Sequence, residues 1–424
     1  MKIRLAYGKS GISIGMPDHY KVDIIEPRWV ESVRDQKLAI TESLGSPYGC
    51  KPLREQLKKN DKVGIIFSDI TRATPYHIIL PPLLEELKSV PKENIRFFCA
   101  NGTHRPATPK ELIDILGESI VKNYEIIQND STNQELHKLV GTTKSGNEIY
   151  INRKILDCDL KILTGFIEPH FFAGFSGGGK SLIPGMAYVK TIKRNHSIRQ
   201  LSNEKVTWGI TEGNQLWEEL TEAAEFVPGL FLLNVSLNKK KEITGVFSGE
   251  LRTAHKHGSQ FVKKSSMVPV DKLYDIVITS NSGYPLDLNV YQSIKGMSAA
   301  AQIVKKGGTI IIAAECWDGI PANSDYETIL KSAGTVEELD GFIRQKENEL
   351  NDTWQIFFQI LVQEKAKVYL YSKKLDDDTI SQALLNPVDD IVKLIEELTA
   401  KSTTEIRICV MPEGPQTIPY LKNL

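Results

Sequence analysis

The sequence predicts an α/β fold of two domains with largely parallel sheets, and three observations support this. Short β-branched runs alternate with stretches whose apolar residues recur at helical spacing, as in parallel sheets flanked by helices. The length of 424 residues suits more than one domain at roughly 100–200 residues each. The charged segment 263–272, broken by Pro269, is a candidate linker. We therefore expect domains over residues 1–267 and 268–424, with the active site in the cleft between them.

The individual elements follow from local patterns. Seven apolar runs of strand length, each bounded by turn residues, are predicted strands: 63–67, 95–99, 160–164, 276–279, 309–313, 368–371 and 406–410. Apolar residues at helical spacing predict helices over 78–88, 110–116 and 388–398, and we also expect a helix over 186–201.

The composition excludes several classes of protein. Lys and Arg number 52 against 53 Asp and Glu, so the chain lacks the basic excess typical of nucleic-acid binders. The five cysteines lie far apart without a CxxC pair, which favours a reducing cytoplasm over a disulfide framework or a structural zinc site. No segment approaches the roughly 20 apolar residues of a membrane span, and the N-terminus lacks the apolar stretch of a signal peptide. We expect a cytoplasmic protein with neither nucleic acid nor membrane as partner.

Polar and ionisable side chains follow four of the predicted strands. Ligands of open α/β sheets bind at the carboxyl ends of the strands, so these loops are where a site is expected. We expect one site to be formed by the loops 68–72, 101–106, 165–181 and 281–295.

Residues 174–181, GFSGGGKS, satisfy the Walker A pattern GxxxxGK[ST], which would indicate a kinase or NTPase. A phosphate loop of that kind springs directly from a strand and opens a helix. Here the predicted strand ends ten residues before Gly174, and Pro184 and Gly185 would break the helix. The NTPase hypothesis is therefore disfavoured, although the glycines and Lys180 could still present N–H groups and a positive charge to an anion.

Three of the eight histidines fall in informative positions. His104 and His170 follow predicted strands, and His196 lies in the predicted helix 186–201. Histidine titrates near neutral pH and suits acid/base catalysis. No HxxxH or HxH pair occurs near a carboxylate, so the sequence does not indicate a conventional zinc site. We expect structural or surface roles for the other five, His19, His77, His137, His255 and His257.

The run 165–181, GFIEPHFFAGFSGGGKS, followed by NHS at 195–197, closely resembles the lactate racemase family, whose members carry a nickel-pincer nucleotide. Supporting segments occur in the family's order: DITR at 69–72, GTHRP at 102–106, GYPLD at 283–287 and YQSIKGM at 291–297. The resemblance implies a nickel-dependent racemase of a short 2-hydroxy acid, most simply lactate, that works by reversible hydride transfer to the cofactor. It also implies partner enzymes that build the cofactor.

The resemblance assigns roles residue by residue. Lys180 matches the lysine that holds the nucleotide covalently through a thioamide, and His196 matches the protein ligand of nickel. His104 and His170 resemble the catalytic acid/base pair. Further matches in the cofactor region are Asp69, Arg72, Gly177, Gly178 and Ser181, and those around the substrate are Arg72, Tyr291, Gln292, Lys295 and Trp354.

These residue types suit the implied chemistry. The α-C–H of a 2-hydroxy carboxylate is a poor acid, whereas oxidation to the planar 2-oxo acid lets a hydride return on the other face. Racemisation therefore needs two bases, one for the hydroxyl group of each enantiomer, and His104 and His170 can supply them. Arg72 offers a bidentate fork to the substrate carboxylate.

The chain departs from the family pattern at three places. Gly179 stands where many relatives have Arg, the segment 316–321 lacks an expected second glycine and glutamate, and Trp354 is either a pocket or a core residue. Two alternatives therefore stay open: another 2-hydroxy acid or an aldonate as substrate, and a non-catalytic nickel or cofactor carrier. A carrier would have no use for His104 and His170.

Overall fold

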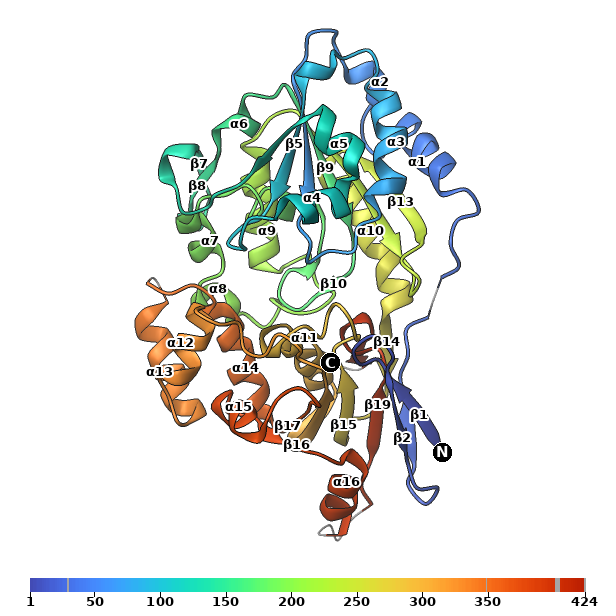
Figure 1. Ribbon diagram of the computed structural model, residues 1–424, viewed down its shortest axis with the longest axis vertical. Helices are drawn as coiled ribbons and strands as arrows, with labels where there is room; N and C mark the ends of the chain where they lie inside the picture. The colour runs from blue at the N-terminus through green and yellow to red at the C-terminus, as the bar shows by residue number, and fades with distance from the viewer. Residues whose placement is uncertain (29, 348, 401–404, 423–424) are drawn as a thin grey trace. The chain divides into compact units, whose positions relative to one another are not determined.

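The computed structural model describes residues 1–28, 30–347, 349–400 and 405–422, and the chain divides into two compact units. The N-terminal unit comprises Trp29–His196 and Ser202–Ser265. The C-terminal unit comprises Met1–Arg28, Ser197–Leu201 and Ser266–Leu424. Each unit is built around its own mostly or wholly parallel sheet, which confirms the predicted α/β class (Figure 1).

The sheet of the N-terminal unit has the strand order β13-β12-β9-β4-β5-β6. Its strands pair in parallel except for β13, which pairs antiparallel with β12 at one edge. The bounds are β4 Val63–Ser68, β5 Ile95–Ala100, β6 Glu125–Gln128, β9 Leu160–Phe166, β12 Leu230–Leu237 and β13 Ile243–Gly249. The three strands predicted in this part of the chain are thus confirmed, because each is a short apolar run that is almost wholly buried.

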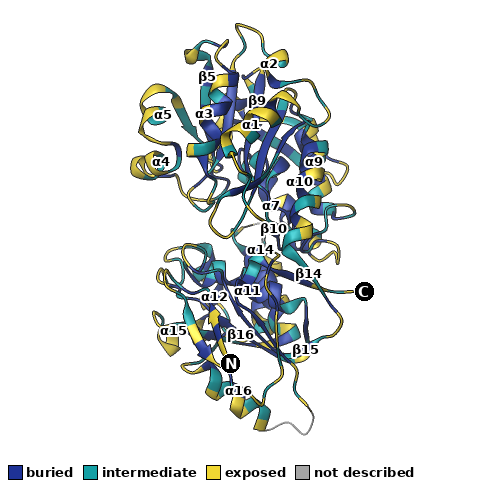
Figure 2. Cartoon of the chain, turned by 90° about the vertical axis from the view of Figure 1, so that its right-hand side faces the viewer, coloured by how far each residue is buried: buried dark blue, intermediate teal, exposed yellow. Residues whose placement is uncertain are grey.

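Helices cover both faces of this sheet. Helices α1 (Gln36–Gly45) and α3 (Tyr76–Glu86) pack on one face with a cluster that includes Ile65, Phe67 and Phe97. Helix α4 (Pro109–Leu116) begins at a capping box formed by Thr108 and Glu111. Helices α9 (Gln215–Glu225) and α10 (Leu251–Ser266) lie on the opposite face, and burial is concentrated in the strands between the two layers (Figure 2).

The order of the strands creates a switch point beside β4. The chain runs from β4 outward to β5 and β6, then returns to place β9 on the other side of β4. The loops after β4 and β9 therefore leave the sheet towards opposite faces and open a crevice at the carboxyl edge. This arrangement explains why the polar loops after the strands converge.

The sheet of the C-terminal unit has the order β18-β17-β16-β15-β19-β3, and every pairing in it is parallel. Its strands are β3 Val22–Ile24, β15 Tyr274–Ser280, β16 Val304–Ala313, β17 Ala366–Tyr371, β18 Asn386–Pro387 and β19 Ile408–Met411. Its longer helices are α11 Val290–Ala301, α12 Asp325–Lys331, α13 Val336–Lys346, α14 Thr353–Lys365, α15 Asp377–Gln382 and α16 Ile391–Ala400.

The smaller elements complete both units. Those of the N-terminal unit are α2 Leu53–Gln56, α5 Glu118–Asn123, α6 Arg153–Leu156, α7 Val189–Asn195, β7 His137–Thr142, β8 Glu148–Asn152, β10 Pro169–His170 and β11 Gly174–Phe175. Those of the C-terminal unit are β1 Lys2–Leu5, β2 Ile12–Gly15, α8 Ile198–Leu201, β14 Met267–Val270 and β20 Ile418–Leu421. Among the described helices, none combines the length and apolar character needed to cross a membrane.

Three expectations about organisation differ from the structure. The first 28 residues belong to the C-terminal unit instead of a domain 1–267, because β3 pairs with β19 and Leu5 packs with Ile278 and Val410. The segment 263–272 does contain the boundary between the units, at Ser265 and Ser266, but it is regular structure and not an irregular linker, because α10 continues to Ser266 and β14 pairs with β20. Pro269 is tolerated there because β14 pairs on one side only. The predicted helix 186–201 is two short helices, α7 and α8, separated at His196 and Ser197, where the chain passes between units.

We predict that Phe97→Ala lowers the free energy of unfolding by about 3–5 kcal/mol. The Phe97 ring is fully buried, with its centroid 6.4 Å from that of Phe67 and 5.3 Å from that of Tyr124, so truncation leaves a cavity in the core. The control is Ile113→Ala, an exposed position on α4, where we expect a change within about 0.5 kcal/mol. Urea unfolding followed by circular dichroism measures both, and equal midpoints for the two variants would contradict the prediction.

Candidate active site

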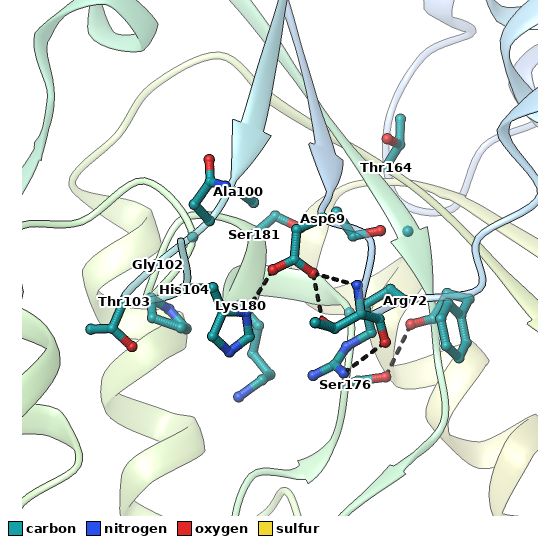
Figure 3. A pocket seen from close by; sticks show the side chains of 18 residues that line it. Asp69, Arg72, Ala100, Gly102, Thr103, His104, Thr164, Ser176, Lys180 and Ser181 are labelled. Atoms are coloured by element: carbon teal, nitrogen blue, oxygen red, sulfur yellow. Dashed lines mark hydrogen bonds and ion pairs between the residues drawn. The ribbon is translucent and has the colours of Figure 1, made fainter. Parts of the chain in front are cut away.

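A cavity of about 130 Å³ lies in the N-terminal unit at the carboxyl ends of β4, β5 and β9 (Figure 3). The loop after β4, the loop after β5 and the glycine-rich segment 176–185 line it. Six of the predicted site residues are among those that line it: Asp69, Arg72, His104, Gly177, Lys180 and Ser181. The cavity therefore occupies the switch point of the sheet, where an open α/β fold binds its ligand.

Asp69 joins the loops after β4 and β5. Its side chain is buried, and its Oδ2 lies 2.6 Å from Nδ1 of His104, as the dashed line in Figure 3 shows. Its Oδ1 accepts hydrogen bonds from the backbone N–H of Thr71 at 3.1 Å and from the Thr71 hydroxyl at 2.6 Å. Burial raises the pKa of Asp69, but the opposing contacts with His104, Thr71 and Arg72 bring it down to about 2. The carboxylate is therefore ionised throughout the neutral range.

Two cationic side chains share the cavity with this carboxylate. Arg72 lies in the loop after β4 and Lys180 in a single 3-10 turn, Gly178–Ser181. Nζ of Lys180 lies 5.0 Å from the centroid of the Phe172 ring, within the range of a cation–π interaction. With two cations and one ionised carboxylate, the cavity is suited to bind an anion.

The glycine-rich segment does not have the architecture of a Walker A loop. Strand β9 ends at Phe166, and the chain then forms the antiparallel pair β10–β11 before it reaches Gly177. A 3-10 turn of four residues stands where the phosphate loop would open a long α-helix. The segment thus lacks both the strand and the helix that the NTPase hypothesis requires.

Asn234 and His255, which the sequence did not indicate as site residues, hold this segment in place. Oδ1 of Asn234 on β12 accepts the backbone N–H of Gly178 at 2.9 Å. Nε2 of His255 on α10 lies 2.9 Å from the carbonyl oxygen of Ser176. Burial lowers the pKa of His255 to about 4, so its neutral ring donates Nε2–H to that carbonyl. A buried asparagine in the otherwise largely apolar run 230–237 was the one available signal.

His170 and His196 are not among the residues that line the cavity. The His170 ring is buried, stacked on Phe171 at 5.0 Å between centroids and edge-on to Phe172 at 4.4 Å. His196 ends α7, with its ring centroid 5.0 Å from that of Phe172. Both histidines and the Lys180 ammonium therefore surround the same phenyl ring. Burial and the charge of Lys180 lower the pKa of His196 to about 3, so its imidazole is neutral.

The four predicted substrate residues in the C-terminal unit form a group of their own. Tyr291, Gln292 and Lys295 share one side of α11, at i, i+1 and i+4. Trp354, on α14, is buried and lies against the Tyr291 hydroxyl, which also donates to Asp352 Oδ1 at 3.3 Å. The role of this group towards a substrate stays a prediction.

Among the described residues, no group of three or more His, Cys, Asp or Glu side chains is placed to hold a metal ion. A nickel ion bound by His196 would need donors from a non-protein group.

The sequence matches two family profiles in order. Residues 7–209 match the lactate racemase N-terminal domain, and residues 270–418 match the lactate racemase C-terminal domain. The chain is 34% identical over 423 residues to the lactate racemase of Thermoanaerobacterium thermosaccharolyticum, covering 98% of each protein. It is 39% identical over 379 residues to that of Lactiplantibacillus plantarum, covering 88% of this chain and 89% of the relative.

Solved structures agree with these matches. The lactate racemase apoprotein of Thermoanaerobacterium thermosaccharolyticum superposes with a TM-score of 0.92 at 33% identity, over 99% of this chain and 100% of that one. A Thermotoga maritima protein superposes with a TM-score of 0.69 at 20% identity, over 91% and 98% of the two chains, and shows the shared fold alone.

An α/β architecture with a cavity at the sheet switch point, read together with these relatives, defines an isomerase of the racemase class. The chain belongs to the lactate racemase family.

We predict that Gly177→Ala destabilises the N-terminal unit more than Gly146→Ala does. Both glycines have positive φ, 75° and 83°, and Gly177 also has a ψ of −159°, a combination essentially restricted to glycine, so an alanine at Gly177 costs about 1–3 kcal/mol in backbone strain. At Gly177 the new Cβ also meets Oδ1 of Asn234, whereas at Gly146 nothing lies within 4 Å. We expect about 1–3 kcal/mol of additional loss at Gly177 from this clash. Thermal unfolding of the two variants measures the difference, and equal losses would refute it.

Proposed function

We propose that the protein interconverts the D- and L-enantiomers of a short 2-hydroxy acid, most simply lactate. The observation that carries this proposal is the cationic switch-point cavity, in which Lys180 and Arg72 flank a histidine paired with an ionised carboxylate. The names of the relatives support lactate as the first substrate to test. Another 2-hydroxy acid or an aldonate would use the same chemistry.

We further propose that the family's cofactor, a nickel-pincer nucleotide, is attached to Lys180 and that His196 binds its nickel. The residues present fit such a group. The charge of Lys180 acts on His196, so the two side chains are close, and a neutral imidazole has the lone pair that a metal needs. Imidazole and sulfur donors suit nickel, and the pincer would supply the ligands that the described residues do not. When bound, the cofactor supplies an electron-poor ring that accepts and returns a hydride.

The side chains of the cavity would bind and orient the substrate. The Arg72 guanidinium offers two parallel N–H groups to the substrate carboxylate, a geometry that fixes its plane as well as its position. Tyr291, Gln292, Lys295 and Trp354 are the further substrate contacts of the proposal. Gly177, Gly178 and Ser181 would lie near the nucleotide. The Gly178 N–H already donates to Asn234, so it is not available to the nucleotide. Gly178 would instead let the nucleotide lie close to the backbone, because it has no side chain.

His104 and His170 would act on the substrate hydroxyl. In one direction a histidine takes the hydroxyl proton as the carbon is oxidised, and in the other a histidine returns a proton as the carbon is reduced. Because the two enantiomers present their hydroxyl groups differently, two histidines serve the two directions. A non-catalytic carrier would have no use for this pair, nor for the Asp69 carboxylate bonded to His104.

The covalent attachment predicts a mass increase. Protein co-expressed with cofactor-building enzymes should show an adduct by intact-mass spectrometry, and Lys180→Ala should lack it because no other amine occupies that place in the cavity lining. Lys190→Ala is the matched control, an exposed lysine on α7 that pairs with Glu148, and it should keep the adduct. An unmodified wild-type protein, or an adduct on Lys180→Ala, would rule out the attachment.

The acid/base assignment predicts loss of interconversion. A chiral assay of cofactor-loaded protein with several 2-hydroxy acids should show racemisation, with lactate among the substrates. His104→Ala and His170→Ala should each lower the rate by about 10²–10⁴-fold, the usual contribution of a proton-transferring group. His257→Ala, an exposed histidine stacked on Tyr48, should leave the rate unchanged. Normal turnover in either catalytic variant would exclude that histidine, and absence of any racemised acid would exclude the function.

A further inference from the structure

The environment of His104 fixes which of its nitrogens carries hydrogen. The Asp69 carboxylate is ionised, so it can only accept hydrogen bonds. Its Oδ2 lies 2.6 Å from Nδ1 of His104, and this distance therefore requires hydrogen on Nδ1. In the neutral ring the lone pair is then on Nε2, the nitrogen on the far side of the ring from Asp69 (Figure 3). His104 lines the cavity, so we assign this basic nitrogen to the cavity lining.

The environment of His170 fixes the opposite arrangement. Its Nδ1 lies 3.5 Å from the backbone nitrogen of Phe172 and 3.4 Å from that of Ala173. Backbone N–H groups can only donate, so Nδ1 of His170 must hold the lone pair and accept from them. In the neutral ring the hydrogen is then on Nε2. A second hydrogen, on Nδ1, would point at two N–H groups, which disfavours the charged form of this ring.

We propose that Asp69 is a positioning residue that presents Nε2 of His104 as a ready base, whereas His170 presents an Nε2–H donor, so the two histidines are not equivalent. This inference rests on the proposed function, in which both face the substrate hydroxyl. It also gives Asp69, assigned by resemblance to the cofactor region, a role in the proton chemistry.

The inequivalence has a defined chemical consequence. When the hydroxyl proton moves to Nε2 of His104, the O–H bond breaks, an N–H bond forms, and the new positive charge rests beside the Asp69 carboxylate. His170 can accept a proton only on Nδ1, and only after its contacts with the two backbone N–H groups are broken. In its resting form His170 offers an Nε2–H donor, and it can serve as the base for the opposite direction only after its ring has left the two backbone N–H groups.

The local turn around Asp69 makes a sharp test possible. In Asp69→Asn the side-chain oxygen should stay towards Thr71, because the backbone N–H of Thr71 and its hydroxyl both donate to that oxygen, whereas an amide NH₂ could accept neither bond. The amide NH₂ would then face Nδ1 of His104 and force hydrogen onto Nε2, reversing the tautomer. The same turn recurs at Asp130, whose Oδ1 accepts the N–H of Thr132 at 3.1 Å and its hydroxyl at 2.7 Å. No hydrogen bond between Asp130 and a histidine occurs among the described residues, so Asp130→Asn is the matched control.

The experiment uses full-length apoprotein labelled with ¹⁵N-histidine at mildly alkaline pH. Long-range ¹H–¹⁵N correlation spectra distinguish a nitrogen that carries hydrogen from one with a lone pair. His104→Gln and His170→Gln assign the two signals. We expect hydrogen on Nδ1 of His104 and on Nε2 of His170 in the wild type, reversal of His104 alone in Asp69→Asn, and no change in Asp130→Asn.

Several results would overturn the inference. These are a wild-type His104 with hydrogen on Nε2, a wild-type His170 with hydrogen on Nδ1, or a His104 that keeps its tautomer in Asp69→Asn. The wild-type spectra decide the matter even if Asp69→Asn does not fold. Because no cofactor or substrate is present, the outcome is independent of the racemisation assay. An active enzyme with two equivalent tautomers would refute this inference alone, and an inactive one with opposite tautomers would refute the proposed function alone.

Discussion

The ionised carboxylate of Asp69, buried at the end of β4, is the constraint on which the rest of the site depends. A buried carboxylate costs several kcal/mol unless hydrogen bonds and opposite charge compensate it. Here Thr71 supplies two donors on one oxygen and His104 a third on the other. These bonds tie the loop after β4 to the loop after β5. The compensation of one buried charge thus sets the position of the His104 ring.

Much of this arrangement follows from the sequence, because strand ends are easy to locate. The apolar runs at 63–67, 95–99 and 160–164 are short and bounded by polar turns, so the residues after them could be assigned to the carboxyl edge of a parallel sheet. Asp69, Arg72, His104 and Lys180 were predicted together on that basis and on the family resemblance, and they line one cavity. The pairing of Asp69 with His104 was not predicted, because it depends on β4 and β5 being neighbours in register.

Contacts between distant elements account for the rest. Asn234 and His255 support the glycine-rich segment from β12 and α10. The asparagine in the apolar run 230–237 was the one sequence signal, and it did not indicate which segment Asn234 contacts. The N-terminal 28 residues were assigned to the wrong part of the chain, because strands of three or four residues give almost no periodic signal. The helix expected over 186–201 ends at His196, where the chain passes from one unit to the other. The spacing of apolar residues does not indicate where a chain leaves one unit for another.

The route of the chain between its two units determines the order in which paired strands become available during synthesis. The C-terminal unit draws on three separate stretches of sequence, and its edge strand β3 pairs with β19, which follows β3 in the chain only after the whole N-terminal unit. The N-terminal unit ends at Ser265, before β19 is synthesised, so β3 has no partner strand until β19 has emerged. A strand of only three residues offers little apolar surface for incorrect association before its partner strand is made.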